Sequence, residues 1–320
     1  TSVLVTGWDI IFLWVARMVM AGYEWEHKRP FDHVYFTGMV RDKQRRKMSK
    51  SLGNSPDALK LIEDFGADGV RFGMLLSSPA GGDLLFDEKL VEQGRNFCNK
   101  IWNALRLVDG WETDENMTIS EGEMLAYHWM VNKMNALATD IDKNFKEYRL
   151  SEALMSIYSF VWSDFCSWYL EMVKPNFGEK ISIKSRENTI QIFSEICSLM
   201  HPFMPFVTEE IWHQLKNGNH DGDCIISTFP KPAPYDQVLI DRVEQAKDII
   251  TNIRDVRNKN GIKMKDELDV LMIKSDRAQA LVNQPGWSEI CIKLGNLRSI
   301  QLSDDESLKG IGFISGTEKC

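Results

Sequence analysis

The chain has 320 residues, of which 43% are hydrophobic and 26% are charged, and its formal net charge is -8. This composition is that of an ordinary soluble protein with room for two or three domains, and it contains no low-complexity tract. The acidic balance argues against a general polyanion-binding protein, although a local basic patch can still bind phosphates.

The cysteine pattern and the hydropathy of the chain argue against disulfide-rich, metal-binding and membrane proteins. The cysteines form no CxxC pair, which favours the reduced thiols of a cytoplasmic protein over a disulfide framework or a structural metal site. No signal peptide is visible, and the apolar run over residues 10–22 is interrupted by Arg17. That run is too short to span a bilayer, so we expect a buried helix and no membrane partner. The cysteines are Cys98, Cys166, Cys197, Cys224, Cys291 and Cys320.

The first elements in chain order indicate an α/β fold. Residues 3–7 (VLVTG) and 33–38 (HVYFTG) are apolar runs typical of buried strands. Residues 9–24 between them are expected to be helical, with Asp9 near the helix N-terminus. Strand, helix and strand with short joins predict a βαβ unit and a parallel sheet.

Helices are predicted for most of the chain after this unit. Two short ones are expected over residues 55–79, the first started by Ser55 and Pro56. From residue 87 onward, long amphipathic helices with modest joins predict an antiparallel bundle. Ser120 and Glu123 form a capping box for one of them. Further bundle helices are expected over residues 151–175 and 185–200 and after HPFMPF at residues 201–206.

The last part of the chain differs from the bundle. A Pro-rich segment over residues 229–236 predicts a linker, followed by a helix over residues 238–259. Residues 267–273 and 297–302 are strand candidates. The predicted fold class is therefore α/β plus all-α. The expected domains are residues 1–86 (nucleotide-binding half and connecting helices), 87–230 (helical bundle) and 231–320 (helix plus a small α/β region).

A basic loop follows the second predicted strand. Residues 41–54 (RDKQRRKMSKSLGN) carry six Lys or Arg residues beside the single Asp42, in a chain of negative charge. The loop lies beyond the C-terminal edge of the predicted sheet, where α/β folds bind ligands. Ammonium and hydroxyl groups there can bind a polyphosphate. A solvated basic turn is the alternative, and the GxxxxGK[ST] spacing of a Walker A loop is absent.

Several motifs, in this order along the chain, resemble the class I aminoacyl-tRNA synthetases. KMSKS at residues 47–51, followed by LGN, is similar to the signature loop of that family. TGWDIIFLWVARM at residues 6–18 resembles the valine-specific branch, whereas the isoleucine-specific branch has a polar run where Ile10, Ile11 and Phe12 stand here. The resemblance covers essentially the whole chain and continues through GRNFCNKIWNALR, WYLEMVKP, HPFMPFVTEEIW and NIRDVRNKNGI.

The resemblance implies ATP-dependent formation of valyl-adenylate and transfer of valine to tRNA(Val), with Mg²⁺ accompanying ATP. Lys47 and Lys50 are the implied catalytic residues, because they would neutralise charge on the β- and γ-phosphates. Gly7 and Asp9 would bind the ribose of the adenylate, although Asp9 alone fits a plain helix N-cap equally well. The implied ATP-binding residues are Gly7, Asp9, Gly38, Lys47, Met48, Ser49, Lys50 and Ser51.

The resemblance also implies a valine pocket and a tRNA-binding surface. Ile10 and Trp14 lie one helical turn apart and would line the valine pocket, or else belong to an ordinary core. Lys89, Lys100 and Arg106 would contact the anticodon, or else form a solvated helix face.

Two positions qualify the tRNA surface. Leu107 stands where family members can carry an aromatic residue, which argues against base stacking at that point. Arg254 and Arg257 share one predicted helix face, where they would contact either tRNA phosphates or neighbouring carboxylates.

Several family features are absent from the sequence. No HIGH-like string, editing domain or C-terminal helical arm is found, and the chain opens directly into a predicted strand without Met. We therefore expect an excised fragment that is inactive alone, holding half of a Rossmann-like domain with an uncovered sheet face. The parent enzyme is expected to be cytoplasmic and monomeric. The alternative is a catalytically inactive RNA-binding or scaffolding module with a synthetase-like fold, against which the intact KMSKS string argues.

Overall fold

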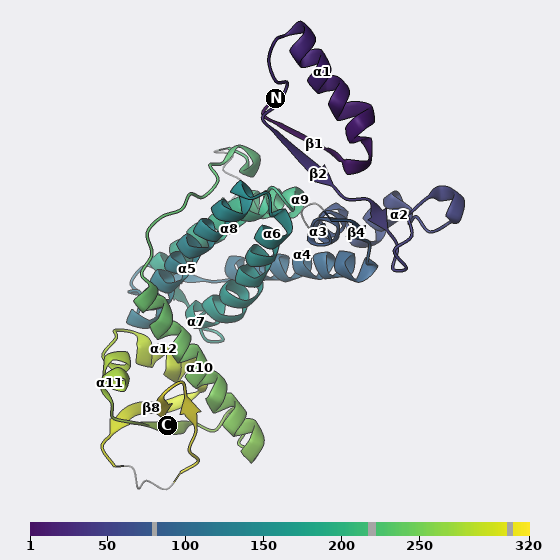
Figure 1. The fold of residues 1–320 in the computed structure, drawn as a ribbon. Helices are drawn as coiled ribbons and strands as arrows, with labels where there is room; N and C mark the ends of the chain where they lie inside the picture. The colour runs from purple at the N-terminus through teal and green to yellow at the C-terminus, as the bar shows by residue number, and fades with distance from the viewer. Residues whose placement is uncertain (79–81, 217–221, 306–309) are drawn as a thin grey trace. The chain divides into compact units, whose positions relative to one another are not determined.

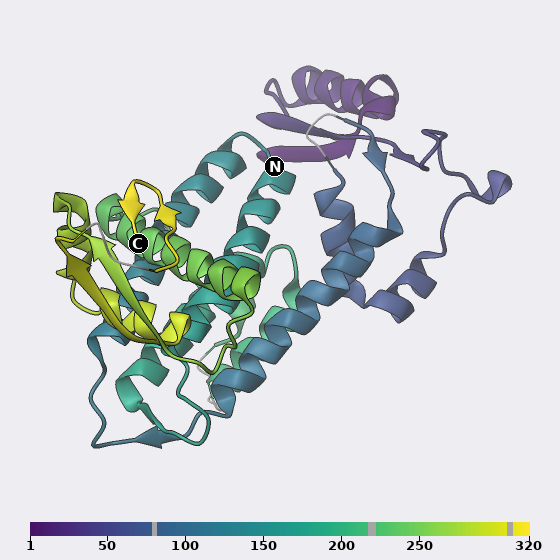
Figure 2. The same ribbon diagram turned by 90° about the horizontal axis from the view of Figure 1, so that it is seen from below.

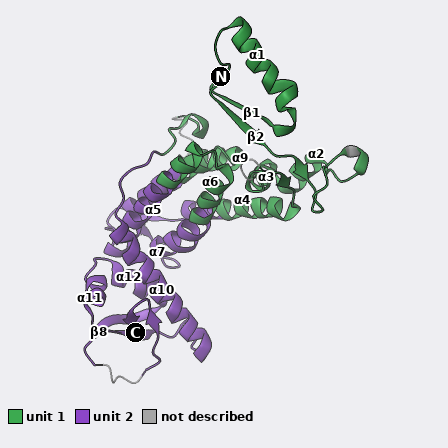
Figure 3. Ribbon diagram, viewed as in Figure 1, with its two compact units in different colours: residues 1–102, 139–160, 196–230 green, residues 103–138, 161–195, 231–320 purple. Residues whose placement is uncertain are grey.

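The computed structural model describes residues 1–78, 82–216, 222–305 and 310–320. The chain forms two compact units, each assembled from segments that are separated in the sequence (Figure 3). Among the described residues, no helix is long and apolar enough to cross a membrane. The first unit contains residues 1–102, 139–160 and 196–230, and the second contains residues 103–138, 161–195 and 231–320.

The first unit begins with the predicted βαβ arrangement. Strands β1 (Val3–Gly7) and β2 (His33–Thr37) pair in parallel, with Val3 opposite His33 and Gly7 opposite Thr37 (Figure 1). The connection is a 3₁₀ turn, a π-helical turn and then α1 (Ala16–Trp25). The expected strands and parallel pairing are therefore confirmed, whereas the helix expected from Asp9 becomes α-helical only at Ala16.

This βαβ unit leaves much of its apolar surface uncovered. The buried helix expected over residues 10–22 is therefore wrong, because only Val15 of that run is buried and no residue of α1 is. Only Val15 and Thr6 of its first twenty residues are buried. The exposed large apolar side chains are Val5, Trp8, Ile11, Phe12, Leu13, Trp14, Met20, Tyr23 and Trp25.

Two short helices follow, with a second small parallel pair formed by β3 (Val40–Arg41) and β4 (Leu84–Leu85). The helices are α2 (Ala58–Phe65) and α3 (Ala67–Leu76). The start expected at Ser55 and Pro56 is wrong, because the carboxylate of Asp57 accepts hydrogen bonds from the backbone of the first turn and caps α2.

Helix α4 (Glu88–Asp109) packs closely against α3 at three glycines. A Cβ on Gly73 would lie 2.7 Å from the backbone nitrogen of Val91, and one on Gly94 would lie 2.7 Å from the carbonyl oxygen of Gly69. The two backbones therefore approach to a distance that only glycine permits at these positions.

The buried side of this contact is aromatic. The rings of Phe72, Phe97 and Tyr158 lie 4.9 to 5.6 Å apart, and Tyr158 comes from α6 (Leu150–Ser159). Aromatic clusters of this kind bury large apolar areas and fix the helices in register.

Helix α3 also holds the start of α9 (Pro205–Leu215). The buried carboxylate of Asp68 accepts hydrogen bonds from the backbone nitrogens of Phe206 and Val207, and Arg71 donates to the carbonyls of Pro202 and Phe203. Asp68 thereby satisfies nitrogens of the first turn of α9, which have no partner within the helix.

Long helices continue the chain through both units (Figure 2). Helix α5 (Glu121–Lys146) starts at the expected capping box, since Ser120 and Glu123 bond reciprocally at 3.0 and 3.1 Å. The helix expected over residues 151–175 is divided into α6, a π-helical stretch (Phe160–Tyr169) and α7 (Leu170–Val173). Helix α8 spans Ile183–Met200. The two-residue strand β6 (Ile181–Ser182) lies directly before α8 and pairs in parallel with β5 (Thr113–Asp114).

The end of the chain forms the expected helix and small α/β region in the second unit. Helix α10 (Gln237–Asn260) precedes β7 (Leu268–Ile273), which pairs in parallel with β8 (Leu297–Ser303). Both strand predictions are therefore confirmed. The crossover helices are α11 (Asp276–Val282) and α12 (Trp287–Gly295), and a hairpin of β9 (Ile314–Ser315) and β10 (Glu318–Lys319) follows.

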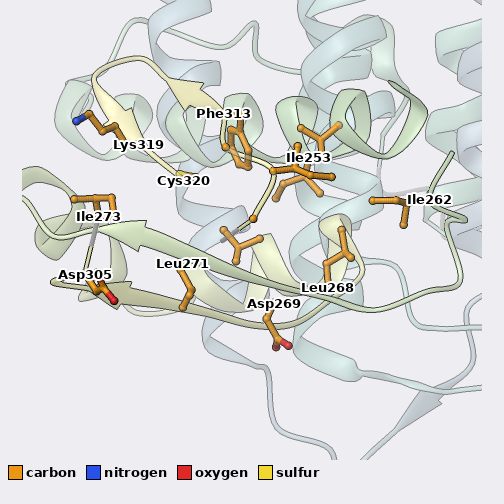
Figure 4. A pocket seen from close by; sticks show the side chains of 15 residues that line it. Ile253, Ile262, Leu268, Asp269, Leu271, Ile273, Asp305, Phe313, Lys319 and Cys320 are labelled. Carbon is orange, nitrogen blue, oxygen red and sulfur yellow. The ribbon is translucent and has the colours of Figure 1, made fainter. Parts of the chain in front are cut away.

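A cavity of about 480 Å³ lies between α10, β7 and the C-terminal hairpin. Figure 4 shows its apolar lining, which includes Ile253, Leu268 and Phe313. None of the site residues expected from the sequence lines it.

Arg257 is a structural residue of this region rather than a tRNA contact. Its side chain is fully buried, and its guanidinium donates to the carbonyl oxygens of Lys263, Asp266, Gly295 and Asn296. Both alternatives expected for it, tRNA phosphates and carboxylates, are wrong, because backbone carbonyls occupy the guanidinium.

Arg254 is likewise engaged within this unit. It donates to the carbonyl of Leu294 at 3.2 Å and lies 5.6 Å from the ring centre of Trp168.

We expect Arg257→Lys to lower the free energy of unfolding by about 3 kcal/mol, because one ammonium group cannot reach all four carbonyls that the buried guanidinium satisfies. The measurement is urea unfolding followed by circular dichroism. Arg298→Lys is the control, since Arg298 is exposed and its ion pairs with Asp269 and Glu267 lie at the surface. Equal stabilities of the two variants would contradict the structural role of Arg257.

Candidate active site

A pocket of about 530 Å³ opens at the C-terminal ends of β1 and β2. Gly7 ends β1 and Thr37 ends β2, with Gly38 next in the chain, so the parallel register brings these residues to one edge. The basic loop contributes Lys47 and Met48 to the lining, and α2 and α3 supply its apolar wall. This edge is where open α/β sheets bind ligands.

Two glycines at this edge have no room for a side chain. A Cβ on Gly38 would lie 1.7 Å from the carbonyl oxygen of Gly82, which is a severe clash with backbone. A Cβ on Gly7 would lie 2.7 Å from Oδ1 of Asp9, so the carboxylate of Asp9 occupies that space. Gly7 and Asp9 are thus neighbours at the end of β1, although Asp9 is exposed and does not line the pocket.

The basic loop turns back on itself directly after β3. Met48 N donates to the carbonyl of Val40 at 3.2 Å, and Asp42 N donates to the carbonyl of Arg46 at 3.0 Å. Arg45 has a left-handed φ of 63° at the tip of this turn. The turn places Lys47 beside β3, with which it forms a bridge at Arg41.

Carboxylates neutralise part of the positive charge of the loop. Arg41 pairs with Asp83, Lys43 with Asp87, and Arg46 with Asp42. Within the described residues, Lys47 has no ion pair, and its side chain is exposed. The loop therefore leaves the ammonium group of Lys47 available at the rim of the pocket.

Asp42, the single carboxylate of the loop, accepts several hydrogen bonds. The hydrogen bond from the Asn54 amide, together with the bonds and charge of Arg46, lowers the pKa of Asp42 to about 2. Asp83 accepts from the backbone of Met39 as well as from Arg41, which also lowers its pKa. The sequence shows Asp42 as the single acid among six basic residues, and that isolation was the available signal for its role.

The remaining loop residues are placed as follows. The hydroxyl groups of Ser49 and Ser51 form a hydrogen bond of 3.1 Å, and Ser49 Oγ also accepts a hydrogen bond from Leu52 N at 3.3 Å. Lys50 starts a 3₁₀ turn (Lys50–Leu52), and its expected role concerns a side chain outside the described part of the structure. The structure thus gathers Gly7, Gly38, Lys47 and Met48 at one pocket, with Ser49 and Ser51 in the adjoining turn.

Ile10 and Trp14, expected at the valine pocket, lie in the helical connection after β1. Ile10 is half-buried and Trp14 is exposed, and neither lines the pocket at the strand ends. They share the connection with Asp9 but form no cavity with the basic loop in the described structure.

The expected anticodon residues all lie on α4. Lys89 and Arg106 are exposed, Lys100 is half-buried, and Leu107 beside Arg106 is exposed. The exposed residues of α4 also include Glu88, Glu92 and Asp109, so its surface carries charges of both signs.

One cluster outside the pocket has side chains suited to a metal ion. Glu209, His213 and Asp223 bring their ligand atoms within 4.8 Å of one another. Both oxygens of Glu209 already accept hydrogen bonds from the backbone nitrogens of Cys224 and Ile225.

Comparison with known families agrees with this arrangement. Residues 1–87 match the family described as tRNA synthetases class I (I, L, M and V), and residues 127–272 match the anticodon-binding domain of tRNA ligase. The chain belongs to the class I tRNA synthetases. The first match contains the strand-end pocket and basic loop of this synthetase chain, and the second contains α8, α9 and α10.

Curated relatives of this synthetase chain are valine–tRNA ligases. The enzyme of Bacteroides thetaiotaomicron is 47% identical over 319 residues, covering 99% of this chain and 36% of that protein. The enzyme of Geobacillus stearothermophilus is 40% identical over 266 residues, covering 80% of this chain and 30% of that protein. The chain thus spans about a third of the length of the curated relatives it matches.

A solved structure supports the fold of this synthetase chain. The ternary complex of Agrobacterium radiobacter K84 LeuRS with tRNA and LeuAMS matches with a TM-score of 0.54 and 16% identity. The match covers 85% of this chain and 30% of that one.

We expect Gly38→Ala to lower the free energy of unfolding by about 1 to 3 kcal/mol, because the new methyl group overlaps the Gly82 carbonyl and forces the backbone apart. Urea unfolding measures the change. Gly312→Ala is the control, since its Cβ would have only one distant neighbour, at 3.8 Å. A Gly38→Ala protein as stable as the control would mean that the edge of the pocket is pliable.

The lowered pKa of Asp42 sets the direction of its pH dependence. Its stabilising contribution is present above the ordinary carboxyl pKa of 3.8 and is lost as the pH falls toward about 2. We expect the Asp42 carboxyl carbon to titrate near pH 2 by NMR in the native chain. A peptide of residues 41–54 is the control and should titrate near 3.8. A native midpoint equal to that of the peptide would rule out the hydrogen-bonded carboxylate.

Proposed function

We propose that this chain supplies the ATP-facing loop and the anticodon-binding region of a valine–tRNA ligase. The reaction is ATP-dependent formation of valyl-adenylate followed by transfer of valine to tRNA(Val). The observation that carries the proposal is Lys47, which has no ion pair among the described residues and lies at a pocket formed by the strand ends at Gly7 and Gly38. Homology to valine–tRNA ligases over nearly the whole chain supports the choice of amino acid.

The pocket suits the nucleotide in size and charge. Its volume of about 530 Å³ lies within the range of small-molecule sites. The ammonium group of Lys47 would bind the β- or γ-phosphate and stabilise the charge that builds there when the valine carboxylate attacks the α-phosphate. Lys50 would add a second positive charge from the adjoining turn. Mg²⁺ would enter with the phosphates of ATP, and the described residues around this pocket provide no carboxylate cluster for it.

The ribose and the amino acid would bind beside the strand ends. Gly7 and Asp9 stand together after β1, where a carboxylate can accept hydrogen bonds from ribose hydroxyls. Ile10 and Trp14 follow on the same connection and would form part of the valine pocket. Their exposure is consistent with a pocket that needs further residues to close it.

The helical part would bind tRNA. Lys89, Lys100 and Arg106 on α4 would meet the anticodon loop, because unpaired loop bases are the part of RNA that a protein reads by sequence. We divide the chain into domains at residues 1–86, 87–230 and 231–320. The first domain would take part in adenylate formation, and the second would bind the anticodon.

The test is a chimera in which this chain replaces the matching third of the Bacteroides thetaiotaomicron enzyme. We expect valine-dependent ATP–pyrophosphate exchange. Lys47→Ala should lower kcat by about 100-fold or more, with a smaller change in KM for valine, since its charge is needed most in the transition state.

Lys43→Ala is the matched control, because Lys43 lies in the same loop but pairs with Asp87. It should retain nearly full exchange. Exchange with isoleucine in place of valine would refute the substrate. A folded chimera that binds tRNA but catalyses no exchange would favour the non-catalytic RNA-binding alternative.

A further inference from the structure

We propose that Asp42 and Asn54 are positioning residues that fix the backbone around Lys47 before any nucleotide binds. We call this pair the bracket. The inference rests on the proposed function, since it assigns the bracket to the lysine that would meet the phosphates. Neither residue lines the pocket, so neither is expected to touch the nucleotide.

Asp42 holds the first half of the loop. Its Oδ1 accepts from the backbone nitrogens of Gln44 and Arg46 at 3.0 and 2.9 Å. Its Oδ2 accepts from Arg46 Nε at 2.8 Å and from Asn54 Nδ2 at 3.0 Å. The Asp42 side chain is only 10% exposed, so these four bonds compete little with water.

Asn54 ties the second half of the loop to the first. Its Oδ1 accepts from the backbone nitrogen of Ser49 at 2.9 Å, and its Nδ2 donates to the Lys47 carbonyl at 3.3 Å as well as to Asp42. Asn54 lies twelve residues after Asp42 in the sequence. Its single amide side chain thus joins three points of the loop. Both hydrogens and the oxygen of the amide are used.

The bracket constrains the backbone on both sides of Lys47. Its carbonyl bonds to Asn54, and the nitrogen of the next residue, Met48, bonds to Val40. The nitrogen of Ser49 is also held. The backbone of Lys47 is therefore fixed, and only its flexible side chain has to be ordered when a phosphate binds.

This pre-ordering has a functional consequence. A loop that is already in place loses less conformational entropy on binding, so more of the phosphate interaction contributes to affinity and rate. The alternative is a purely structural role, in which the bracket only stabilises a surface turn. The two readings differ in whether a bracket variant affects nucleotide binding through Lys47.

The first test uses the chain of 320 residues without nucleotide. Asn54→Asp keeps the shape of the side chain, removes the donor and opposes two carboxylates. We expect amide hydrogen exchange in residues 43–53 to rise at least tenfold. Leu52→Ala is the matched control, because the Leu52 side chain is 64% exposed and carries no hydrogen-bonding group, and it should leave exchange unchanged.

A double variant tests the pairing itself. Asp42→Asn combined with Asn54→Asp restores the side-chain hydrogen bond in the reverse direction. It does not restore the bond to the Lys47 carbonyl, so we expect partial recovery of protection from exchange. Exchange as fast as in Asn54→Asp alone, or wild-type exchange in Asn54→Asp, would overturn the bracket.

The second test is a double-mutant cycle on ATP binding, with Mg²⁺-ATP as the probe in calorimetry. Asn54→Asp and Lys47→Ala should each weaken binding about tenfold, and the combined variant should be no weaker than Lys47→Ala alone. Additive losses would mean that Asn54 does not act through Lys47. The cycle is measured in the chimera described above, because this chain covers only about a third of the length of its relatives. Absence of ATP binding by the unsubstituted chimera would overturn the positioning role together with the proposed function, whereas the exchange experiment would still decide whether the bracket holds the loop.

Discussion

The hydrogen-bonded carboxylate of Asp42 is the interaction on which the basic loop depends. Six cationic side chains in fourteen residues repel one another, and such a segment of an acidic protein could stay extended in solvent. Asp42 counters this repulsion from inside the turn, and Asp83 and Asp87 counter it from the neighbouring segment. The result is partial neutralisation, because Arg41, Lys43 and Arg46 are paired, whereas Lys47 lines the pocket without an ion pair among the described residues.

The contact between α3 and α4 connects this loop region to the helices in the first unit. Glycines on both helices bring their backbones together, and the adjoining aromatic rings fill the space beside them. Since α3 also lines the pocket and holds the start of α9 through Asp68, one short helix links three parts of the unit. A substitution in α3 would therefore disturb the pocket and the helical part at the same time.

The sequence was sufficient for features that depend on local pattern. Apolar runs located β1, β2, β7 and β8, and the reciprocal Ser120–Glu123 cap was readable because it spans three residues. The π-helical stretch after α6 was not predictable, because its apolar spacing over a few turns resembles that of an α-helix. Ser55 and Asp57 are both good capping residues, and only the backbone path shows which one is used.

Side-chain environment was the main limit for the site. An arginine in a charged helix such as α10 is normally exposed, and nothing in the local pattern shows that four carbonyls surround Arg257. The sequence gives no signal for Asn54, because its partners depend on how the loop closes. By contrast, Gly7, Gly38, Lys47 and Met48 could be grouped in advance, because parallel strands end at one edge and the loop follows the second strand.

The uneven burial of the tryptophans gives the chain two intrinsic optical reporters. Trp8, Trp14 and Trp25 of the N-terminal βαβ segment are exposed, whereas Trp129 and Trp287 of the second unit are fully buried. Indole groups in water emit at longer wavelength than those in an apolar core. The red edge of the fluorescence spectrum therefore monitors the surroundings of the βαβ segment, whereas the blue edge monitors the packed cores of both units, since Trp212 of the first unit is buried as well. Opening of the exposed segment and loosening of the packed cores can thus be distinguished without an added dye.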